Sequence, residues 1–230
     1  MKDLGIAKRI MGIDIIRSRQ KHLFLSQKNY LEKVLNRFNM RESKPVTTPL
    51  APHFKLSREQ APKTEDDKED MDKIPYASCV GSLMYSMVCT RPDLAYALSV
   101  VSRFISDTGI EHWKALKWIM RYVKGTLDLG LMYSANSEYR TEIEGYVDSD
   151  YAGSLDTRRS LTGYAFTALG GCIGWKSNLQ KVVALSSTEA EYMVATEAIK
   201  EAIWLKGFTG ELGYIQKTSQ CYATTKVLCI

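Results

Sequence analysis

The chain has 230 residues, a net charge of +5 and a hydrophobic content of 45%, with 25% of its residues charged. This length suits one large domain or two small ones, and the composition is typical of a globular rather than a disordered protein. The sequence contains no apolar run near the ~20 residues that a membrane span needs, and Met1–Gly5 starts no apolar signal segment. We therefore expect an intracellular protein, cytoplasmic or nuclear, without membrane contact.

The cysteines and histidines lack the spacing of a disulfide framework or a metal site. The five cysteines are odd in number and include no Cys-x-x-Cys pair, which argues against both arrangements. His22, His53 and His112 lie far apart in the sequence, and we expect them at the surface or at its boundary. A reducing compartment fits this composition best.

The N-terminal part is basic and predicts a hairpin followed by a helix. Residues 1–50 hold eleven Lys/Arg and four Asp/Glu. Ile10–Arg17 and His22–Ser26 are typical of two paired strands. Apolar residues recur at helical spacing within residues 27–38, with Ser26 as the candidate N-cap. The opposite face of this helix carries basic residues that could contact phosphates or be ordinary solvated side chains: Lys28, Lys33 and Arg37.

The middle of the chain changes from acidic to helical. Residues 57–73 hold four Lys/Arg and seven Asp/Glu without periodic apolar positions, so we expect a solvated linker or loop. Beyond it, three helices are expected. Tyr76–Cys89 is rich in small and apolar residues, and Leu94–Phe104 and His112–Val123 repeat apolar residues at helical spacing. Pro92 suits the first turn of the second of these helices.

The C-terminal part predicts several strands and then one long helix. The expected strands are Ile143–Val147, Gly163–Leu169, Cys172–Lys176 and Lys181–Leu185. The helix is expected from about Thr188 to Leu212, and Tyr222–Ile230 could form a further strand. Strands followed by a helix and a strand predict an α/β or α+β unit with a mixed sheet.

An acidic residue directly follows the first of these strands. Asp148 would be costly to bury against a core, but it suits a strand end at which a cation binds. The alternative is an ordinary turn in which Asp150 and Gly153 form the bend. Both interpretations stay open from the residues alone.

Two glutamates begin the long helix, and a helix start alone explains both. Ser186 and Glu189 satisfy the S/T-x-x-E capping box, and Thr188 with Glu191 satisfies it again. If one glutamate turned toward Asp148, the two carboxylates could hold Mg²⁺ or Mn²⁺ with water completing the shell. Two such ions stabilise the attacking and leaving oxygens of phosphodiester hydrolysis, which requires no histidine or thiol nucleophile.

Several long motifs closely resemble the Pol polyproteins of copia-type LTR retrotransposons, in the order found in that family. Four motifs resemble the ribonuclease H domain: Gly145–Gly153, Asp156–Tyr164, Val183–Met193 and Glu197–Leu205. Upstream, Met1–Gly5 with Met11–Ile15 resembles the end of the reverse transcriptase palm and its primer-grip hairpin. Leu25–Leu35 with Lys44–Pro49 resembles the thumb. The connecting region is resembled by Tyr76–Tyr85, Thr90–Asp93 and Arg121–Thr126.

The resemblance implies an α+β chain, in which a reverse-transcriptase thumb and connection remnant precedes an incomplete ribonuclease H-like α/β domain with a mixed sheet. The implied divisions are a hairpin and thumb-like region, an acidic linker, a helical connection region and the truncated nuclease-like domain: residues 1–56, 57–73, 74–135 and 142–230. The family synthesises DNA from RNA and cuts the RNA strand of RNA–DNA hybrids, the latter with four carboxylates and two Mg²⁺ ions.

Carried over by position, Asp148 resembles the first carboxylate and would bridge both metal ions. Glu191 resembles the helix glutamate, which binds one metal, and Glu189 is the less favoured candidate. The implied partner is an RNA–DNA hybrid or another nucleic acid. The basic residues expected to contact it are Lys28, Lys33, Arg37, Arg158 and Arg159.

Departures from the family pattern imply weakened catalysis. Thr224 stands roughly where the family has its third carboxylate, and Gln220–Ile230 contains no Asp or Glu. The sequence ends before the fourth carboxylate, and the paired aspartates of the polymerase would lie upstream of Met1. We expect a Pol fragment that is catalytically inactive alone, with weak or absent Mg²⁺ binding. The alternatives are a residual metal-dependent hybrid nuclease and a non-enzymatic nucleic-acid-binding module.

Overall fold

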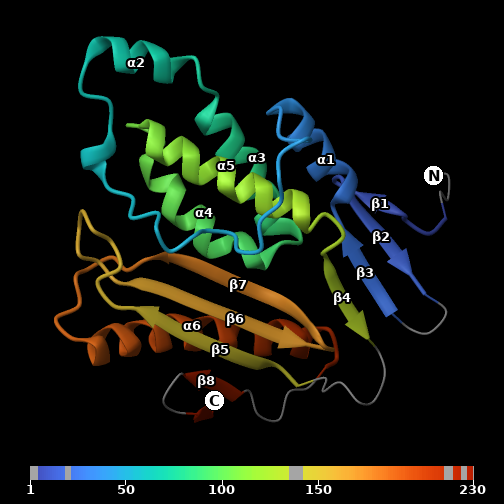
Figure 1. Cartoon of the computed structure of the whole chain (residues 1–230). Coiled ribbons are helices and arrows are strands. Elements are labelled where there is room, and N and C mark those ends of the chain that lie inside the picture. The colour runs from blue at the N-terminus through green and yellow to red at the C-terminus, as the bar shows by residue number, and fades with distance from the viewer. Residues whose placement is uncertain (1–4, 19–21, 135–141, 215–219, 224–226, 230) are drawn as a thin grey trace. The chain divides into compact units, whose positions relative to one another are not determined.

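The structure is a computed structural model that describes residues 5–18, 22–134, 142–214, 220–223 and 227–229 (Figure 1). The chain is mixed α+β and divides into two compact units. Unit 1 comprises residues 1–17 and 24–131, and unit 2 comprises residues 18–23 and 132–230. Among the helices of the described ranges, none is long and apolar enough to cross a membrane.

The first two strands of unit 1 pair as a hairpin at one edge of a sheet, in which the second strand also neighbours the third. β1 (Arg9–Ile10) pairs antiparallel with β2 (Ile13–Arg17). Met11 and Gly12 between them have φ angles of 49° and 76°, and two successive positive φ angles are typical of the type I′ turn that suits the twist of paired strands. The prediction of one strand over Ile10–Arg17 is therefore wrong. β3 (His22–Ser26) follows where the sequence placed it.

Helix α1 (Lys28–Arg37) buries the apolar face that its periodicity predicted, through Leu31, Val34 and Leu35. It starts one residue later than expected, with Gln27 at the N-cap position. The Ser26 hydroxyl accepts a hydrogen bond of 3.3 Å from the amide of Lys28. The prediction of Ser26 as the N-cap is therefore wrong by one position, although its side chain does take up a free amide of the first turn.

The segment predicted to be a linker or loop contains helical structure. η1 (Arg58–Gln60) and α2 (Glu65–Asp72) lie within it. The linker prediction is wrong because local interactions favour a helix here: the Thr64 hydroxyl accepts a 3.1 Å hydrogen bond from the amide of Asp67, and three acidic residues occupy the first turn, where the helix dipole favours negative charge. No residue of α2 is buried, so the segment is solvated as expected.

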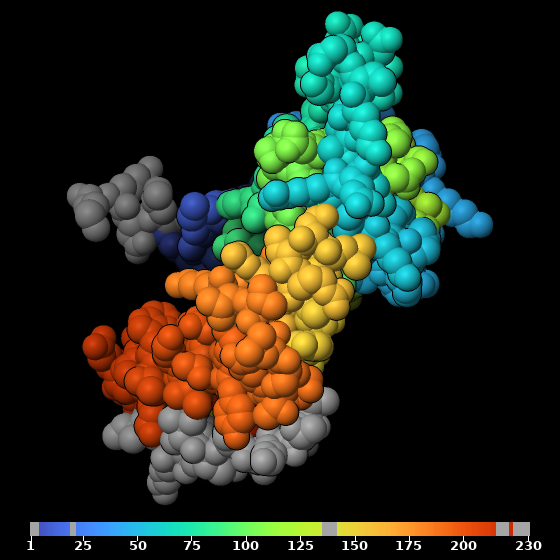
Figure 2. Space-filling model, turned by 90° about the vertical axis from the view of Figure 1, so that its left-hand side faces the viewer, coloured from blue at the N-terminus to red at the C-terminus, as the bar shows by residue number. Residues whose placement is uncertain are grey.

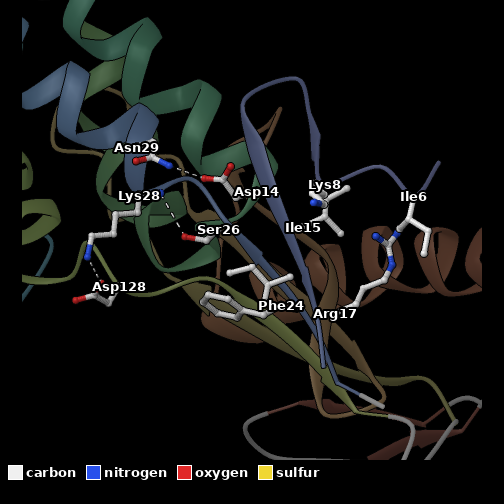
Figure 3. A pocket seen from close by; sticks show the side chains of 11 residues that line it. Ile6, Lys8, Asp14, Ile15, Arg17, Phe24, Ser26, Lys28, Asn29 and Asp128 are labelled. Carbon is white, nitrogen blue, oxygen red and sulfur yellow. Dashed lines mark hydrogen bonds and ion pairs between the residues drawn. The ribbon is translucent and has the colours of Figure 1, made fainter. Parts of the chain in front are cut away.

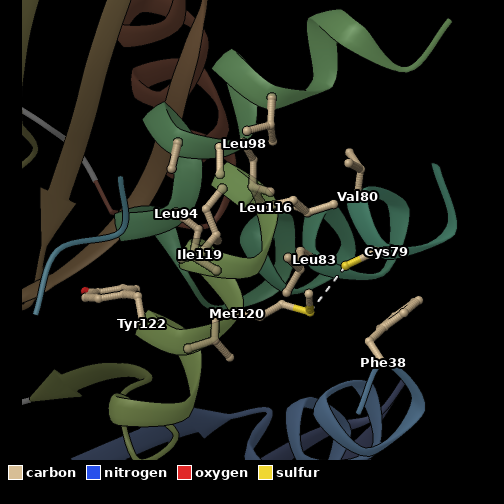
Figure 4. Close-up of a cluster of buried hydrophobic side chains, with 14 of the residues drawn as sticks. Phe38, Cys79, Val80, Leu83, Leu94, Leu98, Leu116, Ile119, Met120 and Tyr122 are labelled. Atoms are coloured by element: carbon tan, nitrogen blue, oxygen red, sulfur yellow. Dashed lines mark hydrogen bonds between the residues drawn. The ribbon is translucent and has the colours of Figure 1, made fainter. Parts of the chain in front are cut away.

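The helices of the expected connection region pack with α1 around one core. They are α3 (Tyr76–Cys89), η2 (Pro92–Leu94), α4 (Ala95–Val101), η3 (Ser102–Phe104) and α5 (Ile110–Gly125). Figure 4 shows the centre of this core, where Leu83, Leu98 and Leu116 are fully buried. Each such side chain contributes roughly 1.5–3 kcal/mol by leaving water. The predicted helix Tyr76–Cys89 is confirmed in full.

His112 is a core residue, so the prediction of a surface histidine is wrong. It is fully buried, and its ring stacks on Phe104 with centroids 4.0 Å apart. Its Nδ1 accepts a hydrogen bond of 2.9 Å from the amide of Gly109, and its Nε2 lies 3.0 Å from the carbonyl of Ser57. Nε2 therefore carries the proton, because Nδ1 acts as the acceptor.

Unit 2 contains a five-stranded mixed sheet with the strand order β7-β6-β5-β8-β9. Its elements, in chain order after β4 (Leu131–Ser134), are β5 (Glu144–Asp150), β6 (Leu161–Ala168), β7 (Gly171–Leu179), α6 (Ser187–Glu211), β8 (Gln220–Ala223) and β9 (Val227–Cys229). β5 is antiparallel to β6 and parallel to β8. The mixed sheet predicted for this part of the chain is confirmed.

Helix α6 covers one face of this sheet (Figure 1). Val194, Ala198 and Ala202 on the helix pack with Val147 and Phe166 on the strands. Small alanine side chains let the helix approach the sheet closely. The strand residues that alternate with Val147 therefore lie on the opposite face.

The fourth predicted strand, Lys181–Leu185, is wrong. These residues follow β7 but form no strand, and the side chains of Val183 and Leu185 are 46% and 86% exposed. The buried Gln180 fixes the chain instead, because its backbone amide donates to the Ser160 carbonyl and its side-chain amide to the Ala190 carbonyl of α6, each over 2.9 Å. The chain thereby turns toward the helix start.

Candidate functional site

Asp148 lies inside β5, two residues before the strand ends. It is exposed, whereas its neighbour Val147 is buried beneath α6, so the carboxylate belongs to the open face of the sheet. Its Oδ1 accepts a hydrogen bond of 2.9 Å from the amide of Ser149. The turn begins only afterwards, with the amide of Gly153 donating to the Asp150 carbonyl over 3.4 Å. The two features considered from the sequence, a carboxylate near the end of a strand and a turn at Asp150 and Gly153, are therefore both present.

Glu189 takes part in the start of α6. The N-cap residue Ser186 accepts a 3.1 Å hydrogen bond from the Glu189 amide, and the Glu189 carboxylate accepts one of 2.7 Å from the backbone amide of Leu185. This reciprocal pattern satisfies amides that a helix start would otherwise leave free. Of the two capping boxes in the sequence, α6 therefore uses the one formed by Ser186 and Glu189.

Glu191 is exposed one half-turn further along α6, next to the buried Ala190. The C-terminal end of β5 and the first turn of α6 lie at the same end of unit 2 (Figure 1), and the strand and helix pack on each other. The fold thus brings the elements that carry Asp148 and Glu191 to one edge of the sheet.

The residues at this edge suit Mg²⁺ better than a softer metal. Within the described residues, no group of three or more His, Cys, Asp or Glu side chains is placed to hold a metal ion. Mg²⁺ in phosphate-handling sites is commonly held by one or two carboxylates together with water and substrate phosphates. Asp148 on the open face of the sheet and Glu191 on the helix that covers the other face are hard oxygen donors of the type that Mg²⁺ prefers. Thr224, predicted at the position of a third ligand, lies outside the described residues.

Two arginines lie on the turn that follows β5, which is yellow in Figure 2. Arg158 and Arg159 are both exposed. Arg158 has a φ of 55°, and hydrogen bonds join its amide to the Ser154 carbonyl and the Ser154 amide to the Arg159 carbonyl, over 2.9 and 3.1 Å. The turn is thus held by its own backbone, and it joins the end of β5 to the start of β6.

The basic residues of α1 divide into two groups. Lys33 and Arg37 are exposed and lie about one turn apart on one face. Lys28 faces elsewhere and forms an ion pair of 2.7 Å with Asp128. That hydrogen bond raises the pKa of Lys28 above its ordinary value. Of the three residues predicted to form one basic face, Lys28 is therefore the one that forms an ion pair with an acidic residue of the same unit.

Lys28 instead lines a hollow of about 790 Å³ in unit 1 (Figure 3). Apolar side chains of Ile15 and Phe24 line it together with the basic Lys8 and Arg17. Lys8 and Arg17 belong to no motif, and only the excess of basic residues in the first fifty positions pointed to them.

A polar network borders this hollow. The Arg9 side chain donates to Asp14 over 2.6 Å, and the side-chain amide of Asn29 donates to the same carboxylate over 2.9 Å. The hydrogen bond from Arg9 lowers the pKa of Asp14. Asp14 is therefore engaged by Arg9 and Asn29, while the Arg17 guanidinium donates to the Ala7 carbonyl over 2.8 Å.

Comparisons with known proteins identify the kind of protein this is. The chain is 54% identical, over 98% of its length, to the retrovirus-related Pol polyprotein of tobacco transposon TNT 1-94. It is 49% identical over 59% of its length to secreted RxLR effector protein 161 of Plasmopara viticola, and 38% identical over 89% of its length to an uncharacterized mitochondrial protein of Arabidopsis thaliana. It covers 94% and 80% of those two proteins. No family model and no solved structure matches the chain.

The chain is thus a retrotransposon protein. More specifically, it belongs to the copia-type Pol polyproteins, which confirms the family that the motifs predicted. It spans 17% of the length of the tobacco polyprotein.

Proposed function

We propose that unit 2 is a ribonuclease H-like domain and that unit 1 is the thumb and connection part of a reverse transcriptase, so that the chain handles RNA–DNA hybrids within a Pol polyprotein. One observation carries this proposal. Three antiparallel strands, a covering helix and a strand parallel to the first follow one another in unit 2, with Asp148 near the end of the first strand and Glu191 on the first turns of the helix.

The residues of this edge support binding more than cleavage. Mg²⁺, when bound, would supply charge stabilisation to the attacking and leaving oxygens of a phosphodiester. Asp148 and Glu191 would hold it, and Arg158 with Arg159 would contact the phosphates of the hybrid. Because Gln220–Ile230 contains no acidic residue, hard oxygen ligands are fewer than in the family. We therefore propose hybrid binding with cleavage that is absent or reduced by orders of magnitude.

A cleavage assay with a matched variant tests this proposal. The parent chain and an Asp148→Asn variant are purified in parallel and incubated with a labelled RNA–DNA hybrid in Mg²⁺ and in Mn²⁺, while binding is followed by fluorescence anisotropy. We expect both proteins to leave the hybrid essentially intact and the parent to bind it more tightly in the presence of the cation. Efficient cleavage by the parent alone would show that two carboxylates suffice. Equal binding by both proteins, with and without cation, would exclude Asp148 as a metal ligand.

A second candidate function is nucleic-acid binding by unit 1 without catalysis. The observation that favours it is the hollow with Lys8 and Arg17 at its rim, together with the exposed Lys33 and Arg37 on α1. Phosphate contacts release counterions, so each lost contact lowers the salt dependence of the affinity by about one unit of slope.

The matched comparison removes two positive charges at different places in unit 1. We expect Lys33→Ala with Arg37→Ala to weaken duplex binding and to reduce the salt slope by about two. The control removes Lys68 and Lys73, which pair with acidic residues on α2 over 2.8 and 2.7 Å, and should leave the slope unchanged. If both double variants weakened binding equally, the affinity would depend on the net positive charge of the chain and not on contacts made by α1.

A further inference from the structure

Gly163 faces Asp148 across the open side of the unit 2 sheet. The register of β5 and β6 pairs these two residues directly. Paired residues of antiparallel strands share a face, so Gly163 lies on the open face, opposite α6. Beside Asp148 on the adjacent strand, the sheet therefore presents bare backbone where any other residue would present a side chain.

The fold itself does not require glycine at this position. A Cβ built on Gly163 would meet only the backbone carbonyl oxygen of Asp148, at an ordinary contact distance of 3.6 Å, and its φ is not positive. By contrast, a Cβ on Gly145 would lie 2.5 Å from the ring of Phe166, and one on Gly171 would lie 2.5 Å from the carbonyl oxygen of Met132. Gly145 and Gly171 are explained by packing, whereas Gly163 is not.

A glycine inside a strand has an energetic cost. It destabilises the folded state by roughly 0.5–1 kcal/mol relative to alanine, because the unfolded chain has more freedom to lose. Such glycines often mark a place where a ligand or another backbone approaches closely. An exposed carboxylate stands opposite Gly163, and two exposed arginines lie on the loop that joins β5 to β6, which suits a ligand that carries phosphates and a bound cation.

We propose that the missing side chain at Gly163 leaves room for the sugar–phosphate backbone of a nucleic-acid strand to approach Asp148. The strand lies against the open face, with its backbone over Gly163 and its phosphates reaching toward Arg158 and Arg159. A methyl group at position 163 would hold the strand away from the carboxylate without disturbing the sheet. This inference rests on the proposed ribonuclease H-like function of unit 2.

The test compares two identical substitutions on opposite faces of the sheet. Gly163→Ala changes the open face. Gly174→Ala, on the adjacent strand β7, changes the face beneath α6, where a Cβ would meet Glu201 and Leu205 at 3.9 and 4.0 Å. Each variant is measured for its melting temperature, for Mg²⁺-dependent hybrid affinity by fluorescence anisotropy, and for Mn²⁺ affinity by calorimetry.

We expect both variants to melt at or above the temperature of the parent, and only Gly163→Ala to lose hybrid affinity, by about tenfold. Mn²⁺ affinity should be unchanged in both, because the carboxylates are intact. Parent-like hybrid binding by Gly163→Ala overturns the inference and leaves the proposed function standing. If the parent chain binds no hybrid, both the inference about Gly163 and the proposed function are overturned, because no nucleic-acid strand then approaches the sheet. A lower melting temperature of Gly163→Ala would mean that the glycine serves the fold, which also overturns it.

Discussion

Arg91 carries the most deeply buried charge described in unit 1, and its removal should be severely destabilising. Its side chain is 1% exposed and pairs with Asp93 through two hydrogen bonds of 2.9 and 2.8 Å. It also donates to the carbonyl and the hydroxyl of Thr126, over 3.1 and 2.7 Å. Tyr122 donates to the same Asp93 carboxylate over 2.9 Å. The Thr-Arg-Pro-Asp motif thus joins the turn between α3 and α4 to the C-terminal end of α5.

The expected magnitude follows from this burial. Removing one partner of a fully buried ion pair costs about 3–5 kcal/mol, a large share of the stability of a typical domain. Because the Asp93 side chain left behind is 30% exposed and keeps the hydrogen bond from Tyr122, we expect the lower part of that range. An exposed ion pair contributes about 0–1 kcal/mol. Arg9 and Asp14 supply that comparison, because they pair over 2.6 Å with 57% of the Arg9 side chain exposed. Arg91→Ala should therefore destabilise unit 1 several times more than Arg9→Ala.

Urea unfolding followed by circular dichroism measures both variants. Hydrogen exchange of peptides from α5 assigns the loss to unit 1, because two units need not unfold in one step. We expect faster exchange in α5 for Arg91→Ala and parent-like exchange for Arg9→Ala. If both variants lost the same small amount of stability, the buried network would not be what holds α5 to the preceding turn.

Three further outcomes follow from buried groups. His112→Phe keeps the stacking on Phe104 but leaves the Gly109 amide and the Ser57 carbonyl unpaired, so we expect a loss of about 1–3 kcal/mol in urea unfolding. Burial raises the pKa of Cys79 from 9.0 to about 12, and this contribution to stability is present below pH 9 and is lost as the pH rises toward 12. Alkaline unfolding of Cys79→Ala should accordingly be less steep between these values than that of the parent. Gly145→Ala should lower the melting temperature by an amount equivalent to ~1–3 kcal/mol, because its methyl group would collide with a fully buried ring.

Long stretches of small and apolar residues account for the correct part of the fold prediction. Tyr76–Cys89 was placed to the residue because such residues predominate over fourteen positions and Arg91-Pro92-Asp93 follows as a break. The predictions for shorter segments were wrong for local reasons. The strand Ile10–Arg17 contains a turn whose first residue, Met11, is not a usual residue at positive φ. Residues 57–73 have no apolar face, so only the capping pattern at Thr64 could have revealed α2.

Burial that depends on distant partners could not be predicted from the sequence. His112 is buried because Ser57, fifty-five positions earlier, supplies a carbonyl to its ring. Arg91 is buried because Thr126, thirty-five positions later, accepts two hydrogen bonds from its guanidinium group. Neither pairing leaves a local pattern. The motif that contains Arg91 did mark a family feature, but its physical role follows only from the tertiary contacts.

The candidate site, too, could be predicted only in part. The sequence does not distinguish the roles of the two glutamates at the start of α6. Ser186 with Glu189 and Thr188 with Glu191 are equivalent as patterns. In the structure the Glu189 carboxylate accepts the Leu185 amide over 2.7 Å, and the Ser186 hydroxyl accepts the Glu189 amide. Glu189 therefore serves the helix start, and the proposed metal site would use Glu191.

This division of roles predicts opposite effects of two single substitutions. Glu189→Ala should lower the stability of unit 2 by about 0.5–2 kcal/mol, the usual range for a lost cap interaction, and leave Mn²⁺ affinity unchanged. Glu191→Gln should leave the melting temperature unchanged and weaken Mn²⁺ binding, because a neutral amide is a poorer ligand for a hard cation than a carboxylate. Thermal unfolding and calorimetric titration separate the two effects. If Glu189→Ala lost the metal while Glu191→Gln kept it, the assignment of the ligand would have to be reversed. Metal loss in both variants would mean that the cation site depends on the geometry of the helix start itself.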